Sequence, residues 1–202
     1  MKKLFAMAAL VLSSVGAFAQ YSAGDVTLQP KVGLNIADLT DTEGSKTRAG
    51  FVGGVEFEYH ISPLVGFSGG LLYSMQGYKE NGDLGKISDD LAGATKTTKN
   101  DYLNIPILAN FYVAQGLAIK AGIQPGFKIN SKETLDTDDL SVSGDLKNTF
   151  NSFDLSIPVG ISYEYQGIVL DARYNIGATK VMDYSNCRNS VFQLTLGYKF
   201  KL

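Results

Sequence analysis

Eight segments of this chain alternate between apolar and polar side chains with a period of two, the pattern of a β-strand with one apolar face. The last segment, VFQLTLGYKFKL, carries an apolar or aromatic residue at every second position from Phe192 to the end. The eight segments cover residues 27–37, 50–60, 65–77, 102–112, 117–129, 153–165, 168–178 and 190–202. Strands average about five or six residues, whereas roughly ten tilted residues cross a bilayer as a strand. The pattern therefore predicts an all-β chain whose strands are long enough to span a membrane.

The connections between these segments alternate between short and long. The stretches HISPL, VAQG and QG form tight turns after the second, fourth and sixth segments. The long polar connections are residues 38–49, 78–101, 130–152 and 179–189. Short periplasmic turns and long extracellular loops are the asymmetry of an outer-membrane barrel. We therefore predict an eight-stranded antiparallel up-and-down transmembrane β-barrel, in which the last segment pairs with the first because lipid does not tolerate an open strand edge.

The N-terminal stretch MKKLFAMAALVLSSVGAFAQ has two lysines, a short apolar run and the sequence Ala17-Phe18-Ala19, which are the three parts of a secretory signal peptide. The apolar run is shorter than the roughly 20 residues that a membrane-spanning helix needs. We expect cleavage after Ala19, with residues 1–19 as the signal peptide and residues 20–202 as the barrel domain, located in the cell outer membrane. Cleavage leaves 16 basic against 20 acidic side chains, and such a chain lacks the basic character of a nucleic-acid-binding protein.

The polar faces of the segments carry charges of both signs, with glycines among them. Eight strands enclose a lumen that side chains just fill, and buried charges need partners of opposite sign. We therefore expect a plugged lumen lined by a charge network of these residues: Lys31, Glu56, Glu58, Lys120, Lys128, Asp154, Glu164, Asp171, Arg173 and Lys199. The alternative is a soluble carrier barrel of the lipocalin type, which has the same alternation but places its apolar set inside.

Aromatic residues near the ends of the segments fit the girdle by which barrels meet the membrane interface. The expected interfacial aromatics are Tyr59, Tyr73, Tyr163, Tyr165, Tyr174, Tyr198 and Phe200. Ordinary β-propensity would also place a tyrosine at such positions. The prolines Pro30, Pro106, Pro125 and Pro158 fall inside the segments, and each removes a ladder hydrogen bond unless it lies at a bulge or at the rim.

The sequence offers few residues for catalysis or metal binding. The single histidine, His60, falls at the periplasmic end of the second segment, in ordinary turn sequence. Glu56 and Glu58 point the same way and could form an acid–base pair, but basic residues on the same face favour structural ion pairs. The stretch DTDD lacks the closing glutamate of a calcium loop, and the single cysteine, Cys187, allows no internal disulfide. We expect no catalytic, cofactor-binding or metal-binding residue.

Five stretches carry a family resemblance: LYSMQGYK, YLNIPILANFY, GIQPGF, LDARYNIG and VFQLTLGYKF. They resemble the porin-family, PorT-like outer-membrane β-barrel domain of Gram-negative bacteria, and the resemblance covers nearly all of the chain after residue 19. It implies a barrel that the barrel-assembly machinery inserts among the lipids of the outer membrane. These motifs are structural, so no residue carries an activity over from the family.

Together these observations favour a non-enzymatic structural or surface-interaction protein that presents four loops to an extracellular partner. A narrow pore for ions or small solutes is the alternative, although a lumen of eight strands is normally filled. An enzyme acting at the extracellular rim is a third class, but His60 is expected at the opposite end of the barrel.

Overall fold

The computed structural model describes residues 21–40, 45–83, 92–137, 140–145, 151–181 and 186–202. The expected signal peptide, residues 1–19, lies outside this described part. The strands are β1 (Val26–Leu39), β2 (Ser45–Ser62), β3 (Val65–Asp83), β4 (Ala92–Asn104), β5 (Ile107–Ala114), β6 (Leu117–Thr137), β7 (Leu140–Asp145), β8 (Phe153–Tyr165), β9 (Ile168–Gly177), β10 (Asn189–Tyr198) and β11 (Phe200–Lys201). Among the described residues, no helix is both long and apolar enough to cross a membrane.

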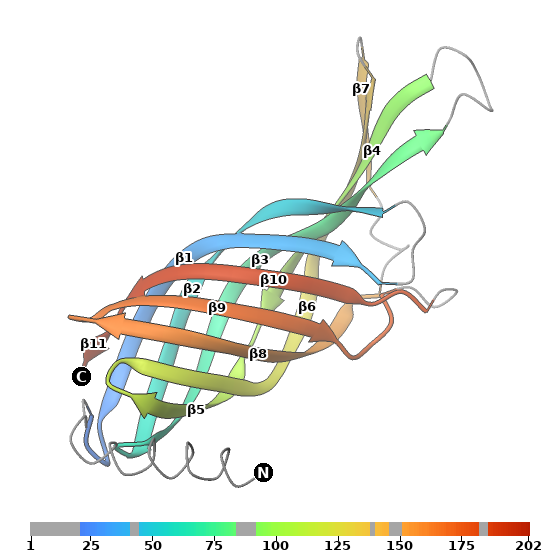
Figure 1. The fold of residues 1–202 in the computed structure, drawn as a ribbon. Coiled ribbons are helices and arrows are strands. Elements are labelled where there is room, and N and C mark those ends of the chain that lie inside the picture. The colour runs from blue at the N-terminus through green and yellow to red at the C-terminus, as the bar shows by residue number, and fades with distance from the viewer. Residues whose placement is uncertain (1–20, 41–44, 84–91, 138–139, 146–150, 182–185) are drawn as a thin grey trace, which may run out of the picture.

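The strands form one antiparallel sheet that closes on itself (Figure 1). Neighbours follow in the order β10, β9, β8, β6, β4, β3, β2 and β1, and β1 then pairs with both β10 and β11. β4 and β5 are two parts of one wall strand, interrupted at Ile105 and Pro106, and β10 and β11 are two parts of another, interrupted at Lys199. β7 pairs with β6 outside this ring. The wall therefore has eight strands, and both the predicted barrel and the pairing of the last segment with the first are confirmed.

The wall has an apolar outer surface and a polar inner surface. In β10, the outward Phe192, Leu194 and Leu196 are 41%, 42% and 54% exposed, whereas Gln193 and Thr195 between them are each 1% exposed. An apolar outer band suits contact with hydrocarbon, whereas a soluble carrier barrel has the reverse arrangement. The soluble-carrier alternative is therefore excluded.

Tight turns close the strands at one end of the barrel, which we call the short-turn rim; the opposite end is the long-loop rim. In the β8–β9 turn, Gln166 and Gly167 have φ angles of 50° and 82°. Two successive left-handed residues are what a two-residue type I′ hairpin requires, and this turn type matches the twist of the flanking strands. The turn thereby fixes the register of β8 against β9, which carry several lumen charges.

Three of the four prolines coincide with breaks in the strand ladders rather than with a rim. Pro106 separates β4 from β5, and its carbonyl oxygen accepts a hydrogen bond from the Gly70 amide at 3.1 Å. Pro30 lies opposite the break between β10 and β11, and Pro158 faces a gap in the β6–β8 ladder. Pro125 lies within β6. The missing N–H groups thus interrupt pairing locally without removing a strand from the wall.

The strands extend further at the long-loop rim than the sequence pattern predicts. β3, β4, β6 and β7 project beyond the wall as an extension of the sheet (Figure 1), and β4 remains paired with β6 as far as Thr95 and Asp136. Large parts of residues 78–101 and 130–152 are therefore strands, and their prediction as loops is wrong. A strand without a buried apolar face needs no period-two pattern, so the sequence contains no alternation to reveal it.

Candidate functional site

The centre of the lumen holds an ion-pair cluster around Arg173 of β9. Its Nη1 and Nη2 donate to Oε1 and Oε2 of Glu56 on β2 at 2.6 and 2.7 Å, and Nη2 also donates to Oδ2 of Asp171 at 2.7 Å. The three residues are 1%, 3% and 0% exposed, respectively. A bidentate pair between a guanidinium and a carboxylate is among the strongest ion-pair geometries in proteins. It connects β2 to β9, two strands that are not neighbours in the sheet.

Two lysines complete this arrangement. Nζ of Lys31, on β1, lies 3.0 Å from Glu56 Oε2 and 3.4 Å from Asp171 Oδ2, and Nζ of Lys120, on β6, lies 3.0 Å from Asp171 Oδ2. We call these two lysines together with Glu56, Asp171 and Arg173 the central cluster. Its three cations share two carboxylates. Removing such ions from water costs several kcal/mol each, so close partners are needed to offset the desolvation.

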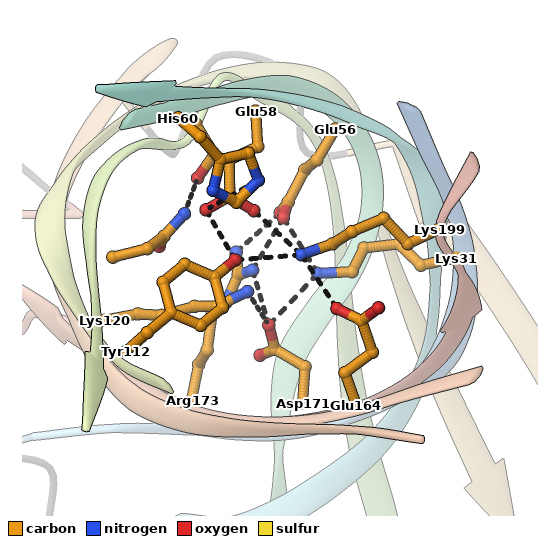
Figure 2. Close-up of polar contacts among 12 residues, drawn as sticks. Lys31, Glu56, Glu58, His60, Tyr112, Lys120, Glu164, Asp171, Arg173 and Lys199 are labelled. Atoms are coloured by element: carbon orange, nitrogen blue, oxygen red, sulfur yellow. Dashed lines mark hydrogen bonds and ion pairs between the residues drawn. The ribbon is translucent and has the colours of Figure 1, made fainter. Parts of the chain in front are cut away.

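A second cluster lies nearer the short-turn rim. Nζ of Lys199 is 2.9 Å from Glu58 Oε2 and 3.3 Å from Glu164 Oε2. It also donates to the Tyr112 hydroxyl at 3.0 Å, and that hydroxyl donates to Glu58 Oε1 at 2.7 Å. We call these four residues the rim cluster, in which one cation faces two carboxylates. The surplus cation of the central cluster is thus balanced by the surplus carboxylate of the rim cluster. Figure 2 shows the side chains of both clusters pointing into the lumen from the surrounding strands.

Tyr21, in the segment before β1, covers the rim cluster. Its hydroxyl donates to Glu164 Oε1 at 2.5 Å, its ring stacks on His60 with 4.1 Å between centroids, and Lys199 Nζ lies 5.1 Å from the ring centroid. Burial, together with the hydrogen bond to Glu164, raises the pKa of the Tyr21 phenol above its ordinary value, so the phenol keeps the proton that it donates. Tyr21 was not predicted from the sequence, where its one signal is an aromatic residue two positions after the expected cleavage site.

His60 is enclosed near the rim cluster, and among the described residues no hydroxyl or thiol forms a hydrogen bond with its ring. It is 0% exposed, its Nε2 lies 4.0 Å from Glu58 Oε1, and within the described part of the chain neither ring nitrogen has a hydrogen-bond partner. The Ser62 hydroxyl oxygen accepts backbone N–H groups of its own turn at 3.1 and 3.3 Å. A general base must reach the proton that it removes. The imidazole instead stacks on the Tyr21 ring, and the tilted ring of Tyr112 lies 5.4 Å from it between centroids.

Glycines make room for the long charged side chains. Gly70 lies opposite Glu56 and Gly160 lies opposite Arg173 in the strand register. A Cβ atom at Gly70 would lie 2.5 Å from Glu56 Cγ, and one at Gly160 would lie 2.9 Å from Arg173 Cγ. Lys31 likewise has a glycine opposite it on both neighbouring strands. The lumen is therefore shaped by alternating long charged and minimal side chains on adjacent strands.

The long-loop half of the lumen is lined by amides and hydroxyls. Asn35 Nδ2 donates to Ser74 Oγ at 2.9 Å, and Gln124 Nε2 donates to Ser156 Oγ at 3.3 Å. Beyond them lies a buried, mainly apolar group that we call the upper cap: Leu39, Tyr78, Val181 and Cys187. Buried side chains therefore lie at both ends of the lumen.

Two residues expected in the charge network lie apart from both clusters. Lys128 is half-buried on β6, opposite Tyr102 in the register. Asp154 is 7% exposed and accepts a hydrogen bond from the Thr179 hydroxyl at 3.2 Å, towards the long-loop rim. The period-two pattern places a side chain on the inner face but does not fix its height along the barrel, which depends on strand stagger.

The expected interfacial aromatics lie on the outer wall. Tyr73 is half-buried, and the other six are between 44% and 62% exposed: Tyr59, Tyr163, Tyr165, Tyr174, Tyr198 and Phe200. The rings of Tyr198 and Phe200 lie 4.7 Å apart. Most of this set gathers towards the short-turn rim, where an amphipathic ring can meet both hydrocarbon and headgroups.

The lumen chemistry is that of ion pairing. Glu56 and Glu58, which could form an acid–base pair by sequence, belong to different clusters and accept from different cations. Among the described residues, no group of three or more histidine, cysteine, aspartate or glutamate side chains could hold a metal ion. Each of the four carboxylates in the two clusters has at least one oxygen paired with a lysine, arginine or tyrosine donor. Asp171 Oδ1, by contrast, is buried without a hydrogen-bond partner among the described residues.

Several solved structures of bacterial surface proteins have the same fold as this chain. Ail, the attachment invasion locus protein of Yersinia pestis, has 15% identity and a TM-score of 0.51 over 88% of this chain and 99% of that chain. A second Ail structure, in complex with the heparin analogue sucrose octasulfate, has 13% identity and a TM-score of 0.52 with the same coverage. Neisserial surface protein A has 16% identity and a TM-score of 0.50 over 87% and 97% of the two chains.

At these identities the likeness shows a shared fold. A comparison with curated protein sequences gave no match. Residues 18–183 match the family described as outer membrane protein beta-barrel domain, which indicates an outer-membrane location. This match spans most of the chain and agrees with the closed ring of eight strands and its apolar outer surface. The chain therefore belongs to the outer membrane protein β-barrel domain family.

Proposed function

We propose that this protein is a non-enzymatic structural or surface-interaction protein of the outer membrane with a plugged, charge-lined lumen. The observation that carries the proposal is the pair of buried clusters, whose side chains come from β1, β2, β5, β6, β8 and β9 and from Lys199. Removing one partner of a buried ion pair costs about 3–5 kcal/mol. A solute path through this half of the lumen would have to separate several such pairs.

The interaction surface of the proposal is the long-loop rim, placed outside the cell as in other outer-membrane barrels. The sheet extension of β3, β4, β6 and β7 projects from this rim (Figure 1). An extracellular partner would meet it together with the remaining residues of 38–49, 78–101, 130–152 and 179–189. The names of two structural neighbours, attachment invasion locus protein and Neisserial surface protein, fit such a role.

Cysteine labelling on intact cells tests this orientation. Gly144 of β7 and Gln115 of the β5–β6 turn are both exposed and lie at opposite ends of the barrel. In a Cys187→Ser background, Gly144→Cys should react with a membrane-impermeant maleimide on intact cells, and Gln115→Cys should react only after lysis. The reverse pattern would overturn the proposal. A photo-cross-linking residue at Gly144 should then capture the extracellular partner, with the same residue at Gln115 as the matched control.

A narrow pore is the second candidate, and the amide- and hydroxyl-lined half of the lumen favours it. Swelling of proteoliposomes in isotonic solutions of small sugars or amino acids separates the two candidates. The plugged barrel predicts swelling no faster than that of protein-free liposomes. Swelling that scales with protein content and falls with solute size would establish the pore instead.

Several narrower expectations from the sequence belong to this proposal. They are the porin-family, PorT-like label, cleavage of the signal peptide after Ala19, and insertion among outer-membrane lipids by the barrel-assembly machinery. N-terminal sequencing of the membrane-embedded protein tests the cleavage site directly, with Gln20 as the expected first residue. A first residue before Gln20 would show that the leader is kept or cut elsewhere.

A further inference from the structure

Four lysines form a row across adjacent strands near the long-loop rim, outside the lumen. Lys46 of β2 lies directly opposite Lys79 of β3, and Lys99 of β4 lies directly opposite Lys132 of β6. β2, β3, β4 and β6 are successive neighbours in the sheet. Directly opposite residues have Cβ atoms about 5 Å apart, and diagonal neighbours are about 7–8 Å apart. We call these four residues the lysine row.

The side chains of the lysine row face away from the barrel axis. Lys99 lies between Thr98 and Asn100, which are 0% and 1% exposed and therefore turned inwards. Lys132 follows Ser131, which is also 0% exposed. Successive residues of a strand point to opposite faces, so Lys99 and Lys132 point outwards.

The same reasoning applies to the other pair. Tyr78 is buried in the upper cap, and Lys79 is the next residue of the strand. The Lys79 side chain therefore points outwards, and Lys79 is exposed. Lys46 is exposed as well and shares the face of Lys79, because directly opposite residues of antiparallel strands lie on one side of the sheet. All four ammonium groups therefore lie on the outer wall.

Among the side chains that the structure describes, few negative charges lie beside the lysine row. Within the described side chains, no carboxylate forms an ion pair with any of the four lysines. Asp101, two residues from Lys99 on the same face, accepts a hydrogen bond from Asn130 at 3.1 Å. Asp145 lies opposite Lys132 in the strand register. Like charges placed directly opposite each other destabilise a strand pair. A bound anion would therefore reduce the repulsion between the lysines of the row.

The position of the row indicates which anion. Ile129, which is 52% exposed on the outer wall, lies three residues before Lys132 on β6, a distance of about 10 Å along a strand. The headgroup region begins where the hydrocarbon core ends and is about 5–8 Å thick on each side. Lys132 thus lies just beyond the apolar band. The row to which it belongs points sideways from the outer wall, towards the surrounding lipid rather than upwards towards the solvent.

We propose that the lysine row binds the phosphate groups of lipid headgroups in the outer leaflet. The proposal relies on the long-loop rim facing outwards, but not on the surface-interaction role or on a closed lumen. A lipid phosphate fits better than a soluble anion because the row lies in the plane of the membrane, at headgroup level. Each lysine near an anionic lipid surface contributes roughly a fivefold gain in affinity.

Binding of lipid A, a phosphorylated glycolipid, tests the proposal in a phosphorus-free, uncharged detergent at low salt. The folded protein should bind lipid A with an affinity that falls roughly thirtyfold in the variant Lys46→Gln/Lys79→Gln, and by a similar factor in Lys99→Gln/Lys132→Gln. The matched control is Lys180→Gln/Arg188→Gln, which removes two exposed cations from the connection between β9 and β10 and should change the affinity by less than about twofold. The ³¹P resonance of lipid A should shift with the wild-type protein and not with the four-lysine variant.

Two competitors distinguish the source of the anion. Inorganic phosphate, at the same phosphate concentration as lipid A, should not displace the lipid, and heparin should not bind the row more tightly than lipid A does. Equal loss in the control variant, unchanged affinity in the row variants, displacement by inorganic phosphate, or tighter binding of heparin would each overturn the proposal.

A charge reversal provides a sign test that does not depend on folding yield. Lys46→Glu places opposite charges across the β2–β3 pair. In uncharged detergent it should raise the thermal midpoint, because the repulsion with Lys79 is removed. The rise in midpoint that lipid A causes should shrink in the same variant. A stabilisation by lipid A as large as that of the wild type would contradict the proposal.

Discussion

The lysines inside the barrel and the lysines on its outer wall share one side-chain chemistry but differ in their surroundings. Lys31 and Lys120 are 2% exposed, and each lies within 3.0 Å of a carboxylate oxygen. Lys46 and Lys79 are exposed and lie opposite each other. A cation removed from water must be neutralised within the fold, whereas a cation at the surface can be left for a ligand. This difference supports the two proposals made above, that the inner lysines help to plug the lumen and that the outer ones bind lipid phosphate.

The largest expected effect comes from breaking the central cluster. Arg173→Met leaves Glu56 and Asp171 buried with fewer partners and should lower the free energy of unfolding by about 3–5 kcal/mol. Lys99→Gln, on the outer wall, should change it by less than about 0.5 kcal/mol. Urea titration in lipid vesicles, followed by the shift between folded and unfolded mobility on gels, measures both. Similar losses in the two variants would remove the distinction between inner and outer cations.

The next effect concerns the tyrosine that covers the rim cluster. Tyr21→Phe removes the hydroxyl that donates to buried Glu164 and should cost about 1.5–3 kcal/mol, as for hydrogen bonds to charged groups. Tyr165→Phe removes a hydroxyl from a residue that is 62% exposed and is expected to be nearly neutral. The same urea titration applies. If Tyr21→Phe were as neutral as its control, the Tyr21 hydroxyl would not help to hold the rim cluster.

A substitution that removes no charge tests the shape of the lumen. Gly160→Leu would bring a side chain against Arg173 Cγ and the Ala172 carbonyl oxygen, and overpacking of this kind costs about 1–3 kcal/mol. A Cβ atom added at Gly144 of β7 would lie in open space, with no contact within 4 Å beyond its chain neighbours. Gly144→Leu is therefore the control and should leave the unfolding midpoint unchanged. Equal tolerance of both changes would show that the inner wall is not close-packed around Arg173.

The smallest effect is pH-dependent. A hydrogen bond from Lys201 holds the pKa of Asp25 below its ordinary value, with Asp25 Oδ2 and Lys201 Nζ 2.8 Å apart. Because the folded-state pKa is lowered, the contribution is present above the unfolded-state value of about 3.9 and is lost as the pH falls through the folded-state value. Asp25→Asn should therefore lower the thermal midpoint slightly at pH 7 and have no effect in strong acid. A difference that persists in acid would point to another cause.

The barrel could be predicted from the sequence because its strands lie between lipid and a polar lumen, which enforces a period of two. Alternation in VFQLTLGYKFKL is strict for that reason, and the structure pairs this segment with β1. β7 and the outer parts of β4 and β6 could not be predicted, since neither face of such a strand has to be apolar. These segments are held by backbone pairing with neighbouring strands. Backbone pairing alone requires no apolar–polar alternation that a single sequence could show.

The candidate site, like the fold, could be predicted from the sequence only in part. The inner charges could be predicted as a set because mixed charges on one strand face need partners, but the pairing of Arg173 with Glu56 depends on strand stagger. Tyr21 lies outside every alternating segment, so its contact with Glu164 had no periodic signal. The lysine row became visible only from the register, because Lys46 and Lys79 are far apart in the chain and lie opposite each other in the sheet.

Residue-resolved acylation of lysines tests the difference between inner and outer cations most directly. The folded protein in uncharged detergent is treated briefly with a water-soluble amine-reactive ester, and each site is quantified by mass spectrometry against the urea-unfolded chain. We expect rapid modification of the lysine row and of Lys201, whose side chain is 61% exposed, and protection of Lys31, Lys120 and Lys199. Modification of Lys31 or Lys120 at the rate of Lys79, in protein that still runs at the folded position on gels, would contradict this expectation.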